Sequence, residues 1–314
     1  MTLSPLEPMH FLIAGVVALL ALASLIGWVL ARRVTSDAGR DTVRNLNARI
    51  KAWWVMVAIF AVAFVFGKMV TIALFAVVSF IALREFYSLT PTHPSDHAAM
   101  AAAFYIFLPL QYWLVAVDWV TMLTIAIPVY AFLALPVLSM VKGVTADFLE
   151  RAAKIQWGLM LAVFCISHAP ALLMLDLGPV RPVYLLFFLV TVVQLSDVFQ
   201  YVAGKLVGRH HMAPNVSPSK TWEGLVIGGL AATGVGAALW WITPFSPLEA
   251  AGMALAIVIA GALGGLVLSA VKRSLGAKDW GKMIEGHGGA LDRMDSVTFA
   301  APVFFHLTNY FFAR

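Results

Sequence analysis

The sequence predicts an all-α, polytopic integral membrane protein with about 9–10 transmembrane helices. Its composition is 61% hydrophobic and only 12% charged, about half of the roughly 25% charged residues found in soluble domains. Several apolar runs reach the roughly 20 residues that a helix needs to cross the hydrocarbon core. The strand-length alternation of a membrane β-barrel is absent. A single cysteine, Cys165, excludes a disulfide framework within the chain.

Residues 1–97 are predicted to form N-terminal transmembrane helices with a basic cytoplasmic loop. The apolar run at 9–31 is longer than the hydrophobic stretch of a signal peptide and no Lys or Arg precedes it, so we expect a retained helix. The runs at 53–67 and 69–83 are short and are separated only by Gly67-Lys68. This spacing fits either a tight hairpin or one re-entrant unit.

Seven further runs complete the set of ten candidate spans. Residues 98–180 are expected to form the middle transmembrane helices, and residues 181–314 a C-terminal catalytic transmembrane domain. Two Gly-x-x-x-Gly spacings, at 224–228 and 261–265, favour close helix packing. The seven runs lie at residues 98–117, 119–141, 155–175, 182–204, 224–242, 248–271 and 295–312.

The basic residues predict the orientation in the membrane. Eighteen of the 21 Lys and Arg residues lie in alternate connections between the spans. Because cytoplasmic loops carry an excess of Lys and Arg, these connections are predicted to be cytoplasmic and both termini to lie outside. The positive net charge then reflects topology rather than a nucleic-acid surface. The basic connections are residues 32–52, 84–97, 142–154, 205–223 and 272–293.

A polar island, Gln194-Leu195-Ser196-Asp197, interrupts the apolar run at 182–204. Asp197 is expected about 10 Å from the cytoplasmic end of that helix. A carboxylate at this depth costs about 2.5–3.5 kcal/mol on insertion scales unless something compensates its charge. A bound cation is one form of compensation, and a hydrogen bond to Ser or Gln within the helix packing is the alternative.

A second polar island runs from Val216 to Gly224, before the next span. Ser217, Lys220 and Thr221 can donate hydrogen bonds to a phosphate, helped by free N–H groups at a helix start. An interfacial Lys with helix-capping hydroxyls explains the same residues equally well. The glycines of a Walker A loop are missing upstream.

The third island, residues 272–295, combines acids, bases and glycines. Asp292 and Asp295 are three residues apart, so they share one face of a helix. With Asp279 and Asp197 they predict an oxygen-rich site of the kind that Mg²⁺ prefers. The basic residues of the island are predicted to contact phosphates. Membrane anchoring explains Lys272 and Arg273 equally well. The basic residues of the island are Lys272, Arg273, Lys278, Lys282 and Arg293.

The histidines give weaker indications. His210 and His211 lack the further ligands of a zinc site. His287 lies between glycines, where it is either a turn residue or a donor to phosphate or substrate. No Gly-x-Ser-x-Gly elbow of a serine hydrolase is present. Acids suited to a divalent metal and bases suited to phosphate favour phosphoryl or nucleotidyl transfer to a lipid.

These residues resemble a known family, the phosphatidate cytidylyltransferases (CDP-diacylglycerol synthases). The signature Ser269-x-Val271-Lys272-Arg273-x4-Lys278-Asp279 is followed by His287-Gly288-Gly289-x-x-Asp292-Arg293-x-Asp295. Upstream, Ser196-Asp197 and Ser217-Pro218-x-Lys220-Thr221-Trp222-Glu223-Gly224 are similar to further motifs of the family, and so is Arg84-Glu85-Phe86-Tyr87. The specific part of the resemblance begins near residue 190.

The resemblance implies that CTP and phosphatidic acid, or a related lipid phosphate, give CDP-diacylglycerol and pyrophosphate. It also implies Mg²⁺ with a second cation such as K⁺, a homodimer, and a place in a bacterial cell (inner) membrane with a cytoplasmic active site. The implied catalytic residues are Asp197, Asp279, Asp292, Asp295, Lys220 and His287, the four aspartates also holding metal. The implied substrate-binding residues are Ser196, Ser217, Thr221, Lys272, Arg273, Lys278 and Arg293.

The chain departs from the family pattern at two places. The family commonly has Ser-Asp-Thr-Gly-Ala-Tyr, and this chain has Ser196-Asp197-Val198-Phe199-Gln200-Tyr201 in its place. The family also usually has Pro at the position of Glu285. These changes leave open a specialised lipid substrate or a divergent branch. The alternatives are a CTP-dependent transferase or kinase for another lipid, an ion-coupled transporter and a non-catalytic lipid-binding relative.

Overall fold

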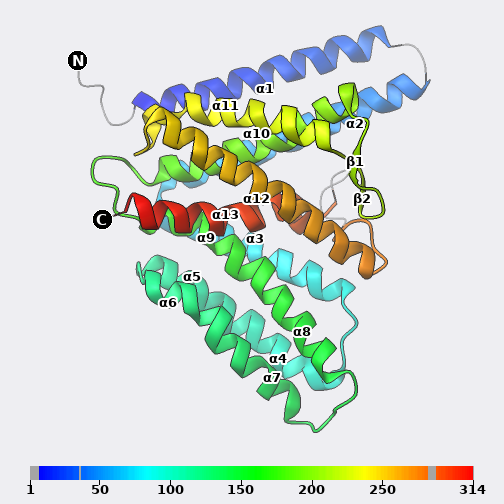
Figure 1. Ribbon diagram of the computed structural model, residues 1–314, viewed down its shortest axis with the longest axis vertical. Helices are drawn as coiled ribbons and strands as arrows, with labels where there is room; N and C mark the ends of the chain where they lie inside the picture. The colour runs from blue at the N-terminus through cyan, green and yellow to red at the C-terminus, as the bar shows by residue number, and fades with distance from the viewer. Residues whose placement is uncertain (1–6, 35–36, 282–287, 314) are drawn as a thin grey trace.

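The computed structural model describes residues 7–34, 37–281 and 288–313, and its helices run back and forth between the two ends of a bundle (Figure 1). Seven helical spans among these residues are long and apolar enough to cross a membrane. The predicted all-α, polytopic membrane fold is therefore confirmed. The seven spans are His10–Arg33, Lys68–Leu89, Pro94–Ala116, Val120–Met140, Phe148–Met174, Val183–Val207 and Pro247–Ser274.

Three helices begin the chain: α1 (Glu7–Arg33), α2 (Asp37–Phe66) and α3 (Lys68–Leu89). The expectation of a loop at 32–52 is wrong, because α2 extends through most of this basic segment. Its Arg, Lys and Ala residues have good helix propensity. Gly67 adopts a positive φ of 88°, and the rings of Phe60 and Phe75 pack edge to face with centroids 5.9 Å apart. Of the two alternatives, α2 and α3 thus form the tight hairpin.

Three rods built from short helical pieces follow, and each contains a wide π turn. Proline explains two of these turns, because it lacks a backbone N–H and membrane helices adjust locally around it. Pro109 follows η2, and Pro128 lies within η3. The first rod contains η1 (Pro94–Asp96), α4 (His97–Ala102), η2 (Ala103–Phe107) and α5 (Leu108–Ala116). The second contains α6 (Val120–Ile125), η3 (Ala126–Ala131) and α7 (Phe132–Met140), and the third α8 (Phe148–Leu159), η4 (Met160–Cys165), α9 (Ile166–Ala171) and η5 (Leu172–Met174).

The C-terminal part contains four more helical rods and a small hairpin that the sequence analysis did not predict. Strands β1 (His211–Ala213) and β2 (Ser217–Thr221) pair antiparallel, with a bulge in the register. The helices are α10 (Val183–Val207), η6 (Gly224–Gly228) continuing as α11 (Gly229–Ala238), η7 (Trp240–Ile242), α12 (Pro247–Ser274) and α13 (Ala290–Phe311).

Glycines hold the helices around α10 and α12 close together. A Cβ at Gly224 would lie 2.7 Å from the Gln200 carbonyl oxygen, and one at Gly228 would overlap the α10 backbone. Gly264 lies equally close to α13, where a Cβ would be 2.9 Å from the Asp295 carbonyl oxygen. The glycine spacing at 224–228 therefore serves packing within the chain.

The basic connections gather at one end of the bundle. In Figure 1 the β1–β2 hairpin, the α7–α8 turn and the end of α12 lie at the right, whereas α1 begins and α13 ends at the left. This alternation follows the up-and-down path that the ten apolar runs predict. The three polar islands of the last third consequently lie toward the same end.

Candidate active site

A pair of carboxylates from two helices forms the centre of the candidate site. Asp197 lies on α10 and Asp295 on α13, and the Ser296 hydroxyl donates to Asp197 Oδ1 at 3.1 Å. The Ser296 backbone N–H donates to Asp295 Oδ1 at 2.8 Å. Ser296 is buried, Asp295 is half-buried and Asp197 is exposed. The pair is thus fixed on its protein side and open on the side of Asp197.

Lys220 brings a positive charge to this pair from the end of β2. Its Nζ donates to the Ala262 carbonyl at 3.4 Å, and a Cβ at Gly265 would lie 2.5 Å from that Nζ and 3.8 Å from Asp295 Oδ2. The missing side chain of Gly265 therefore makes room for the ammonium group beside the carboxylate. The hairpin positions Lys220, which explains why the chain leaves the helical pattern here.

Arg293 adds a second cation. Its charge, like that of Lys220, acts on both Asp197 and Asp295. Its Nε is buried and has no hydrogen-bond acceptor within the described part of the chain. A half-buried arginine with an unused Nε–H donor is suited to an anionic ligand such as phosphate.

Asp292 lies in a different environment, although it is only one helical turn from Asp295. Lys272 Nζ donates to its Oδ1 at 2.6 Å, and the backbone N–H groups of Trp280 and Gly289 donate to its Oδ2 at 2.8 Å each. Both members of the Lys272–Asp292 ion pair are largely buried. This carboxylate joins the end of α12, the following turn and the start of α13.

The four aspartates predicted to hold metal therefore do not converge. Asp197 and Asp295 come together, Asp292 is engaged by protein donors, and Asp279 is exposed in the turn after α12. Within the described residues, no three His, Cys, Asp or Glu side chains form a metal-holding group. The three-residue spacing of Asp292 and Asp295 does place them on one face of a helix. Asp292, however, already accepts hydrogen bonds from Lys272, Trp280 and Gly289, and this separates its role from that of Asp295.

Glu85 is a residue of this region to which the sequence analysis gave no role. Its carboxylate accepts hydrogen bonds from the backbone N–H groups of Ala290 and Leu291, both at 2.9 Å, and so caps the start of α13. Gly281 and Gly289 pack directly on this carboxylate, where a Cβ would overlap it. The available signal was a Glu in a mostly apolar helix, within a motif quoted only for its resemblance.

Of the two residues after Glu85, Phe86 contacts the same turn and Tyr87 ties α3 to α8. Phe86 stacks on Trp280 with ring centroids 5.2 Å apart, and the Tyr87 hydroxyl donates to the Ile155 carbonyl at 2.8 Å. The N-terminal part of the chain thus supports the turn that precedes α13. This contact spans about two thirds of the sequence, so no local pattern indicates it.

The predicted hydroxyl residues have local partners. Thr221 Oγ1 accepts from the Gly224 N–H at 3.1 Å and so helps to begin the next helix. Ser196 is buried and accepts from Gln200 Nε2 at 2.6 Å. Ser217 pairs with Ala213 in the hairpin. Of these three hydroxyls, that of Thr221 thus bonds to the backbone and that of Ser196 to a side chain.

The remaining predicted residues lie around the α12–α13 turn. Arg273 donates to the carbonyls of Val216 and Ala277, at 3.4 and 3.3 Å, and thereby ties the hairpin to α12. Lys278 is exposed. His287, together with Lys282 and Glu285, lies outside the described residues.

The carboxylate of Glu223 links the two ends of the β1–β2 hairpin. Glu223 accepts hydrogen bonds from the His210 ring and from the backbone N–H groups of Arg209 and His210. The His210 hydrogen bond, followed by the backbone donors, lowers the pKa of Glu223 from 4.5 to about 2. Glu223 therefore stays ionised and holds the two ends of the hairpin together.

Comparison with known proteins agrees with this geometry. The sequence profile of the cytidylyltransferase family matches residues 47–311, which include both carboxylates, Lys220 and Arg293. The chain belongs to the cytidylyltransferase family. It is accordingly an enzyme, a nucleotidyltransferase, and the resemblance noted from the motifs is confirmed. Only α1 and the first residues of α2 precede the match to the family.

Relatives of the chain in this family fall into two groups. The uncharacterized protein YnbB of Escherichia coli (strain K12) is 36% identical over 301 residues, covering 95% of this chain and 97% of its own. The phosphatidate cytidylyltransferase of Haemophilus influenzae is 38% identical over 43% of this chain and 48% of its own. That of Mycobacterium bovis is 40% identical over 35% of this chain and 37% of its own. The similarity to proteins named for this activity is thus regional.

Proposed function

We propose that the protein is a CTP:phosphatidate cytidylyltransferase that works at the cytoplasmic face of the membrane. The observation that carries the proposal is the open pair Asp197–Asp295 with Lys220 and Arg293 beside it. Two carboxylates and two cations within a membrane-spanning bundle suit a nucleoside triphosphate, a divalent ion and a lipid phosphate. The regional similarity to phosphatidate cytidylyltransferases supports this choice of substrates.

The residues fit Mg²⁺ as the divalent ion. Mg²⁺ is commonly held by one or two carboxylates together with substrate phosphates, rather than by a cage made only of protein ligands. Asp197 and Asp295 would supply those carboxylates, and their mutual repulsion favours a cation between them. When bound, the ion neutralises the negative charge that gathers on the phosphates.

The chain's own residues would position two anions. Lys220 and Arg293 would hold phosphate oxygens, so that an oxygen of the lipid phosphate faces the α-phosphorus of CTP. A new bond forms between these two atoms, the bond from the α-phosphorus to the bridging oxygen breaks, and its electron pair leaves with pyrophosphate. The attacking oxygen is already anionic at neutral pH, so no proton needs to be removed. Catalysis then consists of positioning and charge stabilisation.

The test is a product assay on purified protein with Mg²⁺, labelled CTP and phosphatidic acid. We expect CDP-diacylglycerol and pyrophosphate, and we expect Asp197→Asn to lower the rate by about 10²–10³-fold because an aligned charge is lost. Asp147→Asn is the matched control, since Asp147 is exposed and has the left-handed backbone that Asn tolerates.

The products also separate the alternatives. Release of CDP with a phosphorylated lipid would assign a CTP-dependent kinase, and turnover of only another lipid phosphate would change the substrate. Full activity in Asp197→Asn would remove this carboxylate from the site. The K⁺ ion and the homodimer implied by the resemblance stay predictions, tested by ion titration of the activity and by mass measurement in detergent.

A further inference from the structure

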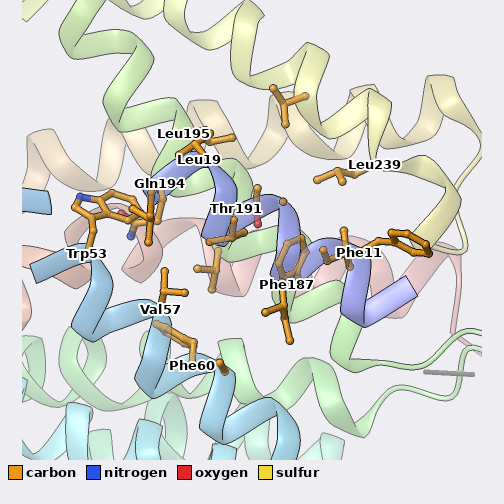
Figure 2. Close-up of a pocket in the computed structure, with 18 residues that line it drawn as sticks. Phe11, Leu19, Trp53, Val57, Phe60, Phe187, Thr191, Gln194, Leu195 and Leu239 are labelled. Carbon is orange, nitrogen blue, oxygen red and sulfur yellow. The ribbon is translucent and has the colours of Figure 1, made fainter. Parts of the chain in front are cut away.

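A cavity of about 340 Å³ lies between α1, α2, α10 and α11 (Figure 2). Its volume is in the range of small-molecule pockets, about 300–1,000 Å³. The described residues that line it are apolar except for Thr191, Gln194 and the indole N–H of Trp53. A cavity with so few polar partners is a poor site for ordered water, which needs two to four of them. Its chemistry therefore suits a hydrocarbon.

The cavity and the candidate active site follow one another along α10. Along α10 its lining runs from Phe187 to Leu195, about 12 Å of helix, and Asp197 follows about 3 Å farther on. Gln194 and Asp197 are three residues apart and so share one side of the helix. Figure 2 shows Gln194 and Trp53 at one end, and Phe11, Phe187 and Leu239 at the other. The polar end of the cavity is thus the end nearer to the carboxylate pair.

We propose that this cavity holds a hydrocarbon chain of the lipid substrate while the lipid phosphate lies at the carboxylate pair. The inference rests on the proposed function, because it assigns the phosphate end to that site. An apolar cavity and a polar centre with two cations, which follow one another along α10, match the two halves of a lipid phosphate. The cavity then selects substrates by their chains.

Helix α1 forms one wall of this cavity, and it lies outside the part of the protein that matches the family as a whole. The match to the cytidylyltransferase family begins at residue 47, after α1, and the two phosphatidate cytidylyltransferases align with less than half of the chain. The alignment with YnbB covers 95% of the chain and so includes at least part of α1. We therefore expect the preference for particular hydrocarbon chains of the lipid to differ from that of enzymes that lack this α1 wall.

Gly15 on α1 allows the cavity to be filled without touching the site. It lines the cavity, and no atom lies within 4 Å of the position its Cβ would take. A phenylalanine there occupies the space that the hydrocarbon chain would use. Gly252 on α12 is an equally open glycine that does not line the cavity. Gly252→Phe is therefore the matched control for Gly15→Phe.

The experiment compares dioleoyl and dihexanoyl phosphatidic acid as substrates of the wild type, Gly15→Phe and Gly252→Phe. We expect Gly15→Phe to lose about tenfold or more in kcat/KM for the long-chain lipid, because a few methylenes in a hydrophobic pocket carry discrimination of this size. Its activity on the short-chain lipid and its KM for CTP should stay at the wild-type values, which also shows that the variant folds. Equal long-chain activity in all three proteins would overturn the proposal.

A binding measurement separates this inference from the proposed function. A lipid phosphate with a diazirine at the end of one chain should label peptides of α1 and α10 in the wild type, and should label them less in Gly15→Phe. This result is expected even if no liponucleotide forms, in which case only the proposed function fails. Labelling confined to other helices would overturn the cavity's role. Equal labelling by a phosphatidylcholine probe would assign the cavity to a resident bilayer lipid and also overturn it.

Discussion

Two carboxylates on α13 lie one helical turn apart and have contrasting surroundings. Asp292 accepts from the Lys272 ammonium and from two backbone N–H groups, so its charge is compensated within the protein. Asp295 faces a second carboxylate, Asp197, and the pair is open on one side. Residue type and spacing are the same in both cases. The difference lies in how many fixed donors each oxygen has, and this separates a carboxylate that holds the fold from one available to ligands.

Lys272→Met would break the closed side of this comparison. It leaves the Asp292 charge buried without its partner, and removing one member of a buried ion pair typically costs about 3–5 kcal/mol. We expect a loss of that size in thermal or denaturant unfolding of the detergent-solubilised protein.

The nearby Lys278→Met is the control, because Lys278 is exposed and surface substitutions usually change stability by no more than about 0.5 kcal/mol. If Lys272→Met lowered activity while unfolding stayed at the wild-type value, Lys272 would belong with the open pair and the contrast between the two carboxylates would fail.

Glu85→Gln would sharpen the comparison from the other side of the turn. The substitution keeps the shape but removes the charge from a buried cap of α13, where the carboxylate accepts two backbone hydrogen bonds. Hydrogen bonds to a charged group contribute about 1.5–3 kcal/mol each, and Gln retains one acceptor, so we expect a loss of about 1–3 kcal/mol in unfolding experiments.

Because Glu85 positions α13 without meeting substrate, kcat should fall more than the affinity for CTP changes, and Glu85→Asp should not restore the wild-type rate since its shorter side chain cannot reach both donors. An unchanged unfolding free energy in Glu85→Gln would show that α13 is held by other contacts.

Hydropathy predicted the all-α membrane fold, and seven helices within the described residues are long and apolar enough to cross a bilayer. It misjudged residues 32–52, where a helix continues into polar sequence and no apolar run marks it. The motif order also brought Asp197 and Asp295 to one place. What spacing could not decide was the state of Asp292, because its partners Trp280 and Gly289 donate through the backbone, which any residue type provides. The role of Glu85 was hidden for a related reason, since its partners lie more than 200 residues away.

The smallest expected change in stability concerns the β1–β2 hairpin that carries Lys220, and this change depends on pH. Glu223 has a pKa lowered from 4.5 to about 2 by the His210 hydrogen bond and by backbone donors. A lowered folded-state pKa means that the stabilisation is fully present above pH 4.5 and is lost as the pH falls toward 2.

Glu223→Gln should therefore lower stability slightly at neutral pH and match the wild type near pH 2. The measurement is the difference in unfolding midpoint between the two proteins along an acid titration. Since Glu223 is at the surface, solvent screens the interaction and the difference should be small. A difference that stayed constant with pH would mean that the hairpin, and with it the position of Lys220 beside the carboxylate pair, does not depend on the charge of Glu223.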